Sequence, residues 1–241
     1  MSPAAPPALG RIATRPAAGA PVMALSSNRN SFSARPHTAA IVATPIPHAP
    51  EEAAPLDIEA NRAARKYSPR EQALRIAWAF GRWLIHLSPY PCYGWRRWVL
   101  RLFGARVGPH ARIAASTRVY MPWNIEIGEW AAVGPEVFIY SLGKVRIGRR
   151  ATVSYRTHVC AGTHDFSDPS LPLLKPAVTI DDDAWVGTDA FIGPGITVGR
   201  SAIVAARAVV VQNVEPGTMV GGHPARVIGE RPVMKKAAFD A

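Results

Sequence analysis

A six-residue repeat of aliphatic side chains is the feature that most restricts what this 241-residue chain can fold into. Fifteen branched aliphatics keep one register from Val107 onward. They occupy positions 107, 113, 119, 127, 133, 139, 147, 153, 159, 180, 186, 192, 198, 204 and 210. A period of six fits neither an α-helix nor the alternation of a simple strand. It fits a coil of three short strands, in which each face of a triangular prism contributes one inward aliphatic.

Small residues punctuate this repeat. Glycine follows several of the aliphatics, as at Gly128 and Gly148, and it suits the corners of a prism, where a Cβ would crowd the next coil. Each coil buries its aliphatic face only against its neighbours, so the coils must stack to be stable. We therefore predict a mainly β fold, a parallel β-helix of about five coils over residues 107–229, with a C-terminal tail over 230–241.

Two regions of different composition precede the repeat. Residues 1–60 are rich in Ala, Pro, Ser and Arg and poor in large apolar side chains, which predicts a disordered tail. Residues 61–106 predict two short helices. Ser68 and Glu71 have capping-box spacing at the start of the first, the prolines of "SPYPCYG" interrupt it, and Gly104 ends the second.

The positive charge is concentrated in one segment. The formal net charge is +11, and residues 61–112 hold eleven Lys or Arg against Glu71 alone. Two interpretations are open: the helices of residues 61–106 cap the open end of the following domain, or they also contact an anionic membrane surface. Because the basic residues are interleaved with Trp and Leu, a membrane is favoured over nucleic acid, and no nucleic-acid partner is predicted.

The cysteines and the hydropathy restrict the compartment. Cys92 and Cys160 are far apart and form no CxxC pair, so neither a disulfide framework nor a thiolate metal site is expected. No uncharged stretch reaches the roughly 18 residues of a membrane span, and the N-terminus lacks the apolar core of a secretory signal. We expect a cytoplasmic protein, located at the inner face of the membrane if the basic helices bind there.

The repeat stops between His164 and Lys175 and resumes at "AVTIDDD", which predicts a loop extruded from one corner of the prism. Such a loop is either a neutral insertion or the carrier of a site. His164 at its root favours a site, because imidazole is suited to take a proton from a hydroxyl near neutral pH. Asp165 follows directly, either as a partner of His164 or as a residue that caps the loop.

The repeat, together with "GWRRWVLRLFGARVG" and "AGTHDF", resembles the hexapeptide-repeat acyltransferases, which are left-handed parallel β-helices. The resemblance is greatest to colanic-acid-biosynthesis-type acetyltransferases and to galactoside and maltose O-acetyltransferases. It implies acetyl-CoA as the acyl donor, a sugar or glycan acceptor, a homotrimer, and His164 as the general base. Nucleotidyltransferase appendages and γ-class carbonic anhydrases have similar repeats, so the period predicts the fold better than the reaction.

No metal is expected. His158 precedes His164 by six residues, about one prism face away, so the two rings do not stack. The other histidines supply no third ligand at the spacing that a γ-class carbonic anhydrase requires.

The resemblance also implies where coenzyme A contacts the chain. In the family, a Trp of this hexad and nearby backbone groups line a slot between adjacent subunits, and an arginine near the C-terminus approaches the coenzyme's phosphate. The corresponding residues are Trp185, Gly187, Thr188, Ala206 and Arg226. Small residues let a pantetheine arm approach the backbone, although Gly187 and Ala206 fit equally well as plain corner residues.

Two departures from the family pattern concern the substrates. Tyr140 and Ser141 stand near the position where the family often has Asn, one coil before the base, and with Asp165 they are the candidate acceptor-side residues. Val211 and Gln212 replace a common Thr-Lys pair, and loss of that lysine should weaken the grip on an anionic nucleotide.

The leading hypothesis is an acetyl-CoA-dependent O-acetyltransferase that acts on a sugar hydroxyl of an exopolysaccharide or cell-surface glycan precursor by direct transfer. One alternative is acetylation of an amino group on an amino sugar or an amino acid. A hypothesis of another class is a non-catalytic β-helix that serves as a binding scaffold.

Overall fold

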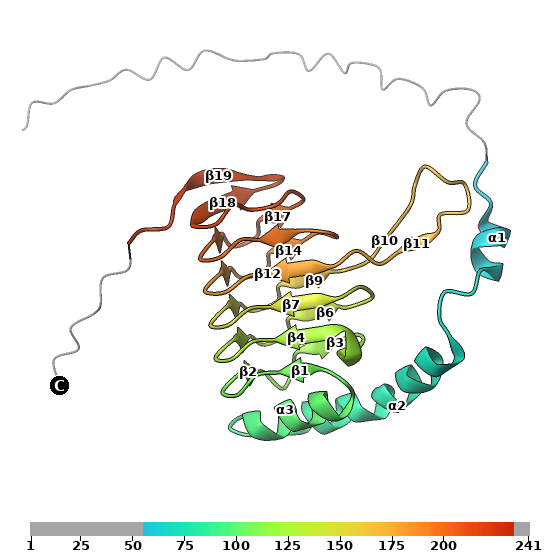
Figure 1. The fold of residues 1–241 in the computed structure, drawn as a ribbon, viewed down its shortest axis with the longest axis horizontal. Coiled ribbons are helices and arrows are strands. Elements are labelled where there is room, and N and C mark those ends of the chain that lie inside the picture. Colours follow the sequence, from blue (N-terminus) through green and yellow to red (C-terminus); the bar gives the residue numbers. More distant parts are fainter. Residues whose placement is uncertain (1–54, 234–241) are drawn as a thin grey trace, which may run out of the picture. The chain divides into compact units, whose positions relative to one another are not determined.

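The computed structural model describes residues 55–233 and consists of a parallel β-helix preceded by three α-helices (Figure 1). Most of the predicted disordered tail, residues 1–54, and most of the predicted C-terminal tail, residues 234–241, lie outside the described residues. The predicted boundary at residue 60 is wrong, because the first helix already begins at Ile58. No helix within residues 55–233 is long and apolar enough to cross a bilayer.

Two of the three helices were predicted. The second has the expected capping box, in which the Ser68 hydroxyl accepts from the Glu71 backbone and the Glu71 carboxylate accepts from the Ser68 backbone. The first helix is an addition that the composition did not indicate. The helices are α1 (Ile58–Ala63), α2 (Pro69–His86) and α3 (Tyr93–Leu102).

The strands form three parallel faces and one hairpin outside them. The first face contains β1 (Arg106–Val107), β4 (Ile125–Ile127), β7 (Val145–Ile147), β12 (Val178–Ile180) and β15 (Thr197–Val198). The second contains β2 (Arg112–Ile113), β5 (Ala132–Val133), β8 (Thr152–Val153), β13 (Trp185–Val186), β16 (Ile203–Val204) and β18 (Thr218–Gly222), with β19 (Ala225–Glu230) at its edge. The third contains β3 (Arg118–Val119), β6 (Phe138–Tyr140), β9 (His158–Cys160), β14 (Phe191–Ile192) and β17 (Val209–Val210).

The hexad aliphatics form the core, as predicted. Of the fifteen, all but Val119 are buried, and Val119 is partly buried against the same cluster. Parallel pairing stacks each one on its counterpart in the next coil, as when Ile127 pairs with Ile147. Five complete coils are followed by a partial sixth, in which Val214 bridges Val198 and β18 pairs with β16. The prediction of about five coils is therefore confirmed.

Glycines after the aliphatics allow adjacent coils to approach closely. A Cβ on Gly148 would lie 2.5 Å from the backbone nitrogen of Asp182, and one on Gly128 would lie 2.5 Å from that of Arg149. Such positions admit no larger residue without moving the backbone. The left-handed backbone of the corners falls on other residues, such as Trp130 and Arg150, with φ of 59° and 56°.

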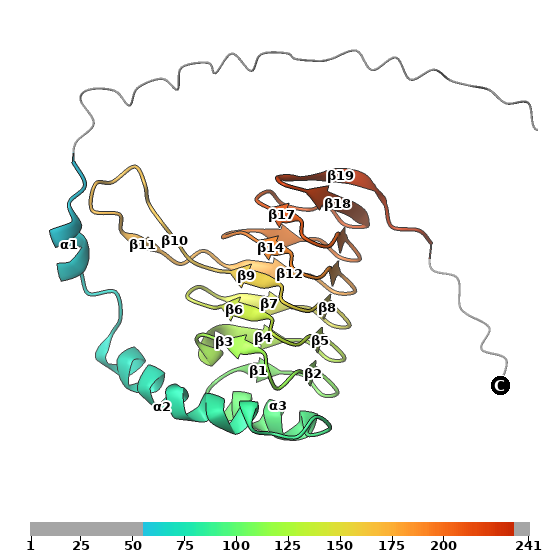
Figure 2. The ribbon, with the colours of Figure 1, turned by 180° about the vertical axis from the view of Figure 1, so that it is seen from behind.

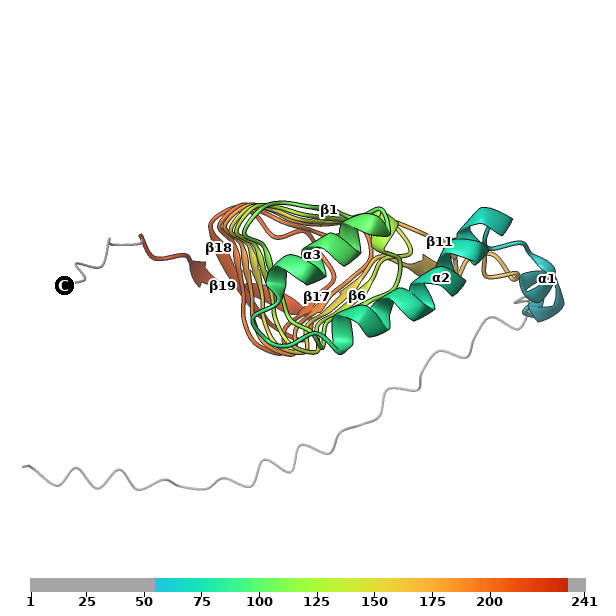
Figure 3. The same ribbon diagram turned by 90° about the horizontal axis from the view of Figure 1, so that it is seen from below.

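Helices α2 and α3 cover the open end of the first coil (Figure 3). The first coil has no coil beneath it, so its carbonyl groups need other donors. Arg96 Nε donates to the Ile113 carbonyl at 2.7 Å, and Arg97 donates to the Ala111 carbonyl at 3.0 Å. Arg101 Nε donates to the Val107 carbonyl at 2.9 Å. These contacts support the capping interpretation, because they explain three basic residues of α3 without a membrane.

One outgrowth interrupts the stack, at the place where the hexads fail. Strands β10 (Thr163–His164) and β11 (Leu173–Leu174) form an antiparallel hairpin that extends sideways from the coils (Figure 1, Figure 2). The predicted extruded loop is thus present. A short 3-10 turn, η1 (Pro122–Asn124), forms a smaller insertion in the first coil.

Candidate active site

His164 lies in β10, at the root of the hairpin, and its side chain is exposed rather than buried in the aliphatic stack. Its Nδ1 atom is 2.6 Å from the carbonyl oxygen of Leu171, at the far side of the loop. A carbonyl oxygen can only accept a hydrogen bond, so Nδ1 must carry a proton. In the neutral ring, Nε2 is then unprotonated and its lone pair can accept a proton. An imidazole held in this tautomer can remove a proton from a ligand that approaches Nε2.

The loop that supplies this carbonyl is built from side-chain-capped turns. The Asp165 carboxylate accepts from the backbone nitrogen of Ser167 at 3.0 Å and from its hydroxyl at 2.5 Å. These bonds lower the pKa of Asp165 below its usual value. Asp168 accepts from Ser170 in the same way. Asp165 therefore caps the loop, and its predicted role beside the acceptor is not supported.

Ser141 cannot bind an acceptor, so that prediction is wrong. Its side chain is fully buried, and its hydroxyl both accepts from the Met121 backbone nitrogen and donates to the Met121 carbonyl, each at 2.9 Å. The reason is the alternation of the strand, which directs residue 141 to the same side as the inward Ile139. The sequence contained this signal.

Tyr140 points to the opposite side of that strand and is half-buried near the hairpin. Its ring centroid lies 4.9 Å from that of Tyr120, and burial raises the pKa of the Tyr140 hydroxyl above its usual value. A Cβ on Gly162 would lie 3.2 Å from the Tyr140 ring, so the tyrosine packs against the backbone two residues before His164. Of the predicted acceptor-side residues, Tyr140 alone remains a candidate.

The predicted coenzyme residues lie on and beside the second face. Trp185 opens β13 with 49% of its surface exposed, and its indole nitrogen donates to the Ser154 hydroxyl at 3.0 Å. A Cβ on Gly187 would lie 2.7 Å from the Ala206 backbone nitrogen, so Gly187 is required by the coil packing itself. Thr188 is half-buried, and Ala206 is exposed.

Arg226 lies in β19, at the edge of the same sheet. Its side chain is exposed, and its guanidinium donates to the neighbouring Ala225 carbonyl at 3.0 Å. This leaves most of its donor groups facing solvent, where an anionic group could pair with them.

One chain does not bring the two halves of the predicted site together. Viewed along the prism, the β10–β11 hairpin that carries His164 extends on one side, whereas β18 and β19 lie on the other (Figure 3). The strands that carry His164 and Arg226 therefore lie on different sides of the prism.

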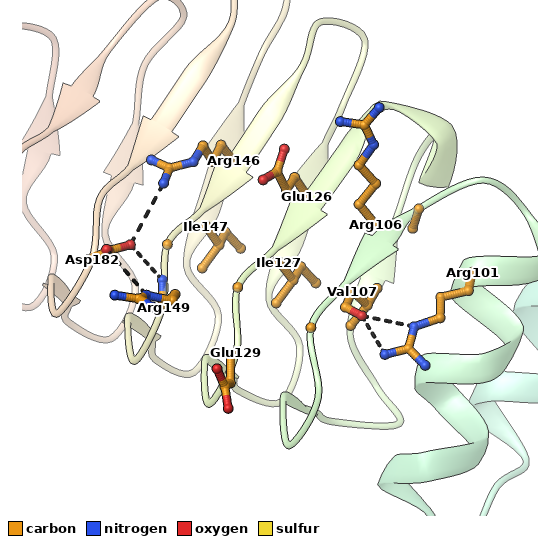
Figure 4. A pocket seen from close by; sticks show the side chains of 14 residues that line it. Arg101, Arg106, Val107, Glu126, Ile127, Glu129, Arg146, Ile147, Arg149 and Asp182 are labelled. Atoms are coloured by element: carbon orange, nitrogen blue, oxygen red, sulfur yellow. Dashed lines mark hydrogen bonds and ion pairs between the residues drawn. The ribbon is translucent and has the colours of Figure 1, made fainter.

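Two other features contain titratable side chains but none of the predicted site residues. A groove of about 580 Å³ runs past β1, β4 and β7, and within it the Arg146 and Arg149 side chains pair with Asp182 (Figure 4). Arg146 contacts Asp181 at 2.8 Å, and Asp182 accepts from the Arg149 backbone at 2.8 Å. His158 is enclosed by aromatic rings of the third face, and burial lowers its pKa. Within residues 55–233, no three His, Cys, Asp or Glu side chains are grouped as metal ligands.

Sequence reasoning missed Asn61, which donates from α1 to the loop that holds His164. Its side-chain nitrogen lies 2.8 Å from the same Leu171 carbonyl oxygen that accepts from His164. Asn61 and Leu171 are separated by 110 positions in the sequence, and no local pattern links them.

Comparison with known proteins finds relatives in sequence and neighbours in structure. No protein-family model matches the chain. It is 34% identical over 158 residues to a putative colanic acid biosynthesis acetyltransferase of Escherichia coli (strain K12), covering 66% of this chain and 87% of the relative.

Among solved structures, a hexapeptide-repeat-containing acetyltransferase from Vibrio cholerae superposes with a TM-score of 0.64 at 25% identity. That match covers 68% of this chain and 94% of the other, and the Vibrio protein has also been solved in complex with acetyl coenzyme A. A maltose O-acetyltransferase from Clostridium difficile 630 shares the fold, with a TM-score of 0.63 at 24% identity over 68% of this chain and 90% of its own.

Proposed function

The chain belongs to the hexapeptide-repeat acetyltransferase family, and from this membership we propose that it transfers the acetyl group of acetyl-CoA to a sugar hydroxyl. The acceptor is an exopolysaccharide or cell-surface glycan precursor, by analogy with the name of the Escherichia coli relative. The observation that carries the proposal is the Nδ1 bond of His164 to Leu171, which leaves Nε2 free as a base at the root of the hairpin.

In this reaction, His164 Nε2 takes the proton of the acceptor hydroxyl while the hydroxyl oxygen attacks the thioester carbonyl carbon. A backbone N–H beside the coenzyme holds the oxyanion of the tetrahedral species. The C–S bond then breaks, and the imidazolium returns the proton to the departing thiolate. As His164 becomes cationic, its bond to the Leu171 carbonyl becomes charge-assisted and stronger.

Direct transfer needs no nucleophile from the protein. Cys160 is the described thiol nearest to His164 in the sequence, and burial raises its pKa above the usual value. Its Sγ donates to the Gly162 carbonyl at 3.3 Å, so it is held as a neutral thiol. These features make Cys160 a poor acyl carrier and favour a single transfer step.

The donor is proposed to bind on the second face of a neighbouring subunit. Trp185, Thr188 and Ala206 would line the pantetheine arm beside Gly187, and Arg226 would pair with a phosphate. Because the His164 hairpin and this face lie on different sides of one prism, each site needs two copies of the chain. A closed ring of three subunits, as the family implies, gives every hairpin a partner face.

The outward surfaces of α2 and α3 are proposed to contact an anionic membrane from the cytoplasmic side. Helix α2 buries one apolar face on the first coil and exposes another on the opposite side. The exposed apolar side chains of the two helices, together with the C-cap residue Leu87 of α2, are Ile76, Phe80, Trp83, Leu84, Leu87, Trp95, Trp98 and Leu102. Such a stripe suits the interface between lipid headgroups and acyl chains, where a lipid-linked acceptor would be within reach.

The test of the function is an assay of acetyl transfer from acetyl-CoA to purified glycan precursors, with hydroxyl-only and amino-bearing sugars compared. Mass spectrometry of glycan intermediates from cells with and without the protein should show a difference of one acetyl group. Transfer to amines alone would replace the proposal with N-acetylation. Turnover that is unchanged in His164→Ala would remove His164 as the base. For the membrane contact, Phe80→Glu together with Trp83→Glu should abolish co-sedimentation with anionic vesicles.

A further inference from the structure

Helix α1 is bound to the loop of the β10–β11 hairpin, although the two lie more than one hundred residues apart in the sequence. The two segments lie side by side in opposite views (Figure 1, Figure 2). The Asp57 backbone nitrogen donates to the Pro169 carbonyl at 2.9 Å. The Asn61 side-chain nitrogen donates to the carbonyls of Ser170 at 2.6 Å and Leu171 at 2.8 Å. None of the side chains of α1 is buried, so polar contacts rather than apolar packing hold it there.

The orientation of the Asn61 amide is determined by its neighbours. Lys66 Nζ lies 2.8 Å from Asn61 Oδ1, and an ammonium group can only donate. The amide oxygen must therefore face Lys66, and the NH₂ group must face the two loop carbonyls. Both ends of the amide have matching partners, so this orientation is the one that satisfies every group.

Asn61 and His164 share one acceptor. The Leu171 carbonyl oxygen has two lone pairs, and it receives the Asn61 amide and the His164 Nδ1–H. Leu171 itself has a φ of 46°, a left-handed conformation that a branched residue adopts only when its surroundings hold it. The two Asn61 bonds, to the carbonyls of residues 170 and 171, supply part of that support.

We propose that Asn61 is a positioning residue that acts on His164 through the Leu171 carbonyl, an inference that rests on the proposed function of His164. By fixing this oxygen, Asn61 keeps the proton on Nδ1 and holds the ring so that Nε2 faces the acceptor. A residue from before the β-helix thus helps to orient the proposed catalytic histidine. Lys66 contributes by donating to Asn61 Oδ1, which orients the Asn61 amide toward the loop carbonyls.

The kinetic test compares Asn61→Ala with Arg62→Ala in the full-length protein. Arg62 is an exposed neighbour on the same helix, so it controls for general effects on α1. In Asn61→Ala, kcat should fall about tenfold, because a poorly placed base loses much of its catalytic contribution. The KM for acetyl-CoA should stay unchanged, since the donor residues lie on another face. Lys66→Met should show a smaller loss of kcat in the same direction.

The second readout is the tautomer of His164, measured by solid-state NMR of protein with nitrogen-15-labelled histidine, with the signal assigned by its loss in His164→Gln. The wild type should show a proton on Nδ1, and Asn61→Ala should show a mixture of both tautomers. A folded Asn61→Ala variant with an unchanged tautomer overturns the proposal, as does an equal loss of kcat in Arg62→Ala. If the wild type transfers no acetyl group but Asn61→Ala still shifts the tautomer, the function fails and the positioning role stands.

Discussion

His164 Nδ1 and the Leu171 carbonyl oxygen lie 2.6 Å apart, across a loop that the Asp165 and Asp168 side chains cap from within. This single bond orients the ring and determines which nitrogen is free. The carbonyl belongs to the loop that interrupts the six-residue repeat, so the contact depends on that interruption.

Replacement of His164 should remove the base while leaving the fold intact. In His164→Gln, kcat should fall by roughly 100- to 10,000-fold, the usual contribution of general-base catalysis. Coenzyme A binding, measured by isothermal titration calorimetry, should be unchanged. His86→Gln, a change at an exposed histidine of α2, is the control and should keep full activity. Equal losses in the two variants would contradict the assignment.

Two inactive variants should restore activity when they share one trimer. His164→Ala and Trp185→Ala damage different halves of the proposed site, and these halves come from adjacent subunits. Co-expression in equal amounts should give about one quarter of wild-type activity, since about one interface in four then combines two intact halves. Each variant alone should be nearly inactive. Activity no greater than that of the separate variants would mean that the site lies within one chain.

Substitution of Cys160 should leave turnover nearly unchanged. The thiol has a raised pKa and donates to a backbone carbonyl, so it carries no acyl group in the proposed mechanism. Cys160→Ser preserves a donor to Gly162 and should retain kcat within about twofold, since no transition-state contact is lost. Intact-protein mass spectrometry after mixing with acetyl-CoA should detect no acetylated enzyme. A stable acetyl adduct on Cys160 would instead establish two-step transfer.

A methyl group at Gly148 should destabilise the β-helix. The added Cβ would lie 2.5 Å from the Asp182 backbone nitrogen, so adjacent coils would have to separate. Gly148→Ala should lower the free energy of unfolding by about 1–3 kcal/mol, the usual effect of overpacking. Gly229→Ala is the matched control, because a Cβ there meets no atom within 4 Å. Urea denaturation should show the loss in the first variant alone.

The corner ion pair of Arg150 and Asp183 should contribute to stability only above acidic pH. Arg150 Nε lies 2.6 Å from Asp183, and this contact holds the pKa of the Asp183 carboxyl below its usual value of about 3.9. A lowered folded-state pKa gives stabilisation that is present above the unfolded value and is lost as the pH falls through the folded value.

Arg150→Met should therefore unfold at lower urea than wild type at pH 7, with a difference that shrinks toward about pH 3. The effect should be small, because both groups contact solvent. Arg70→Met, an exposed change outside the pair, should show no pH-dependent difference. A difference between Arg150→Met and wild type that grows as the pH falls would refute this sign.

The periodic part of the molecule was determined by the sequence itself. The hexad register places each aliphatic on the inside of a coil. Side chains alternate between the two sides of a short strand, so the sequence alone determines which residue faces inward. The same local logic predicted the capping box at Ser68 and the extruded loop after His164. Alternation along the strand also indicates that Ser141 faces inward, although Ser141 was predicted as an acceptor-side residue. Each of these features depends on residues within a few positions of one another.

Tertiary structure decided what the polar side chains do. Arg96, Arg97 and Arg101 form a basic run in the sequence, yet each donates to a carbonyl of the first coil, which only the packing of α3 on that coil brings within reach. Asn61 and Leu171 meet because a helix from before the repeat folds onto a loop within it. The role of a polar side chain depends on the group that it bonds. When that group lies about a hundred residues away, as for Asn61 and Leu171, no local sequence pattern predicts the contact.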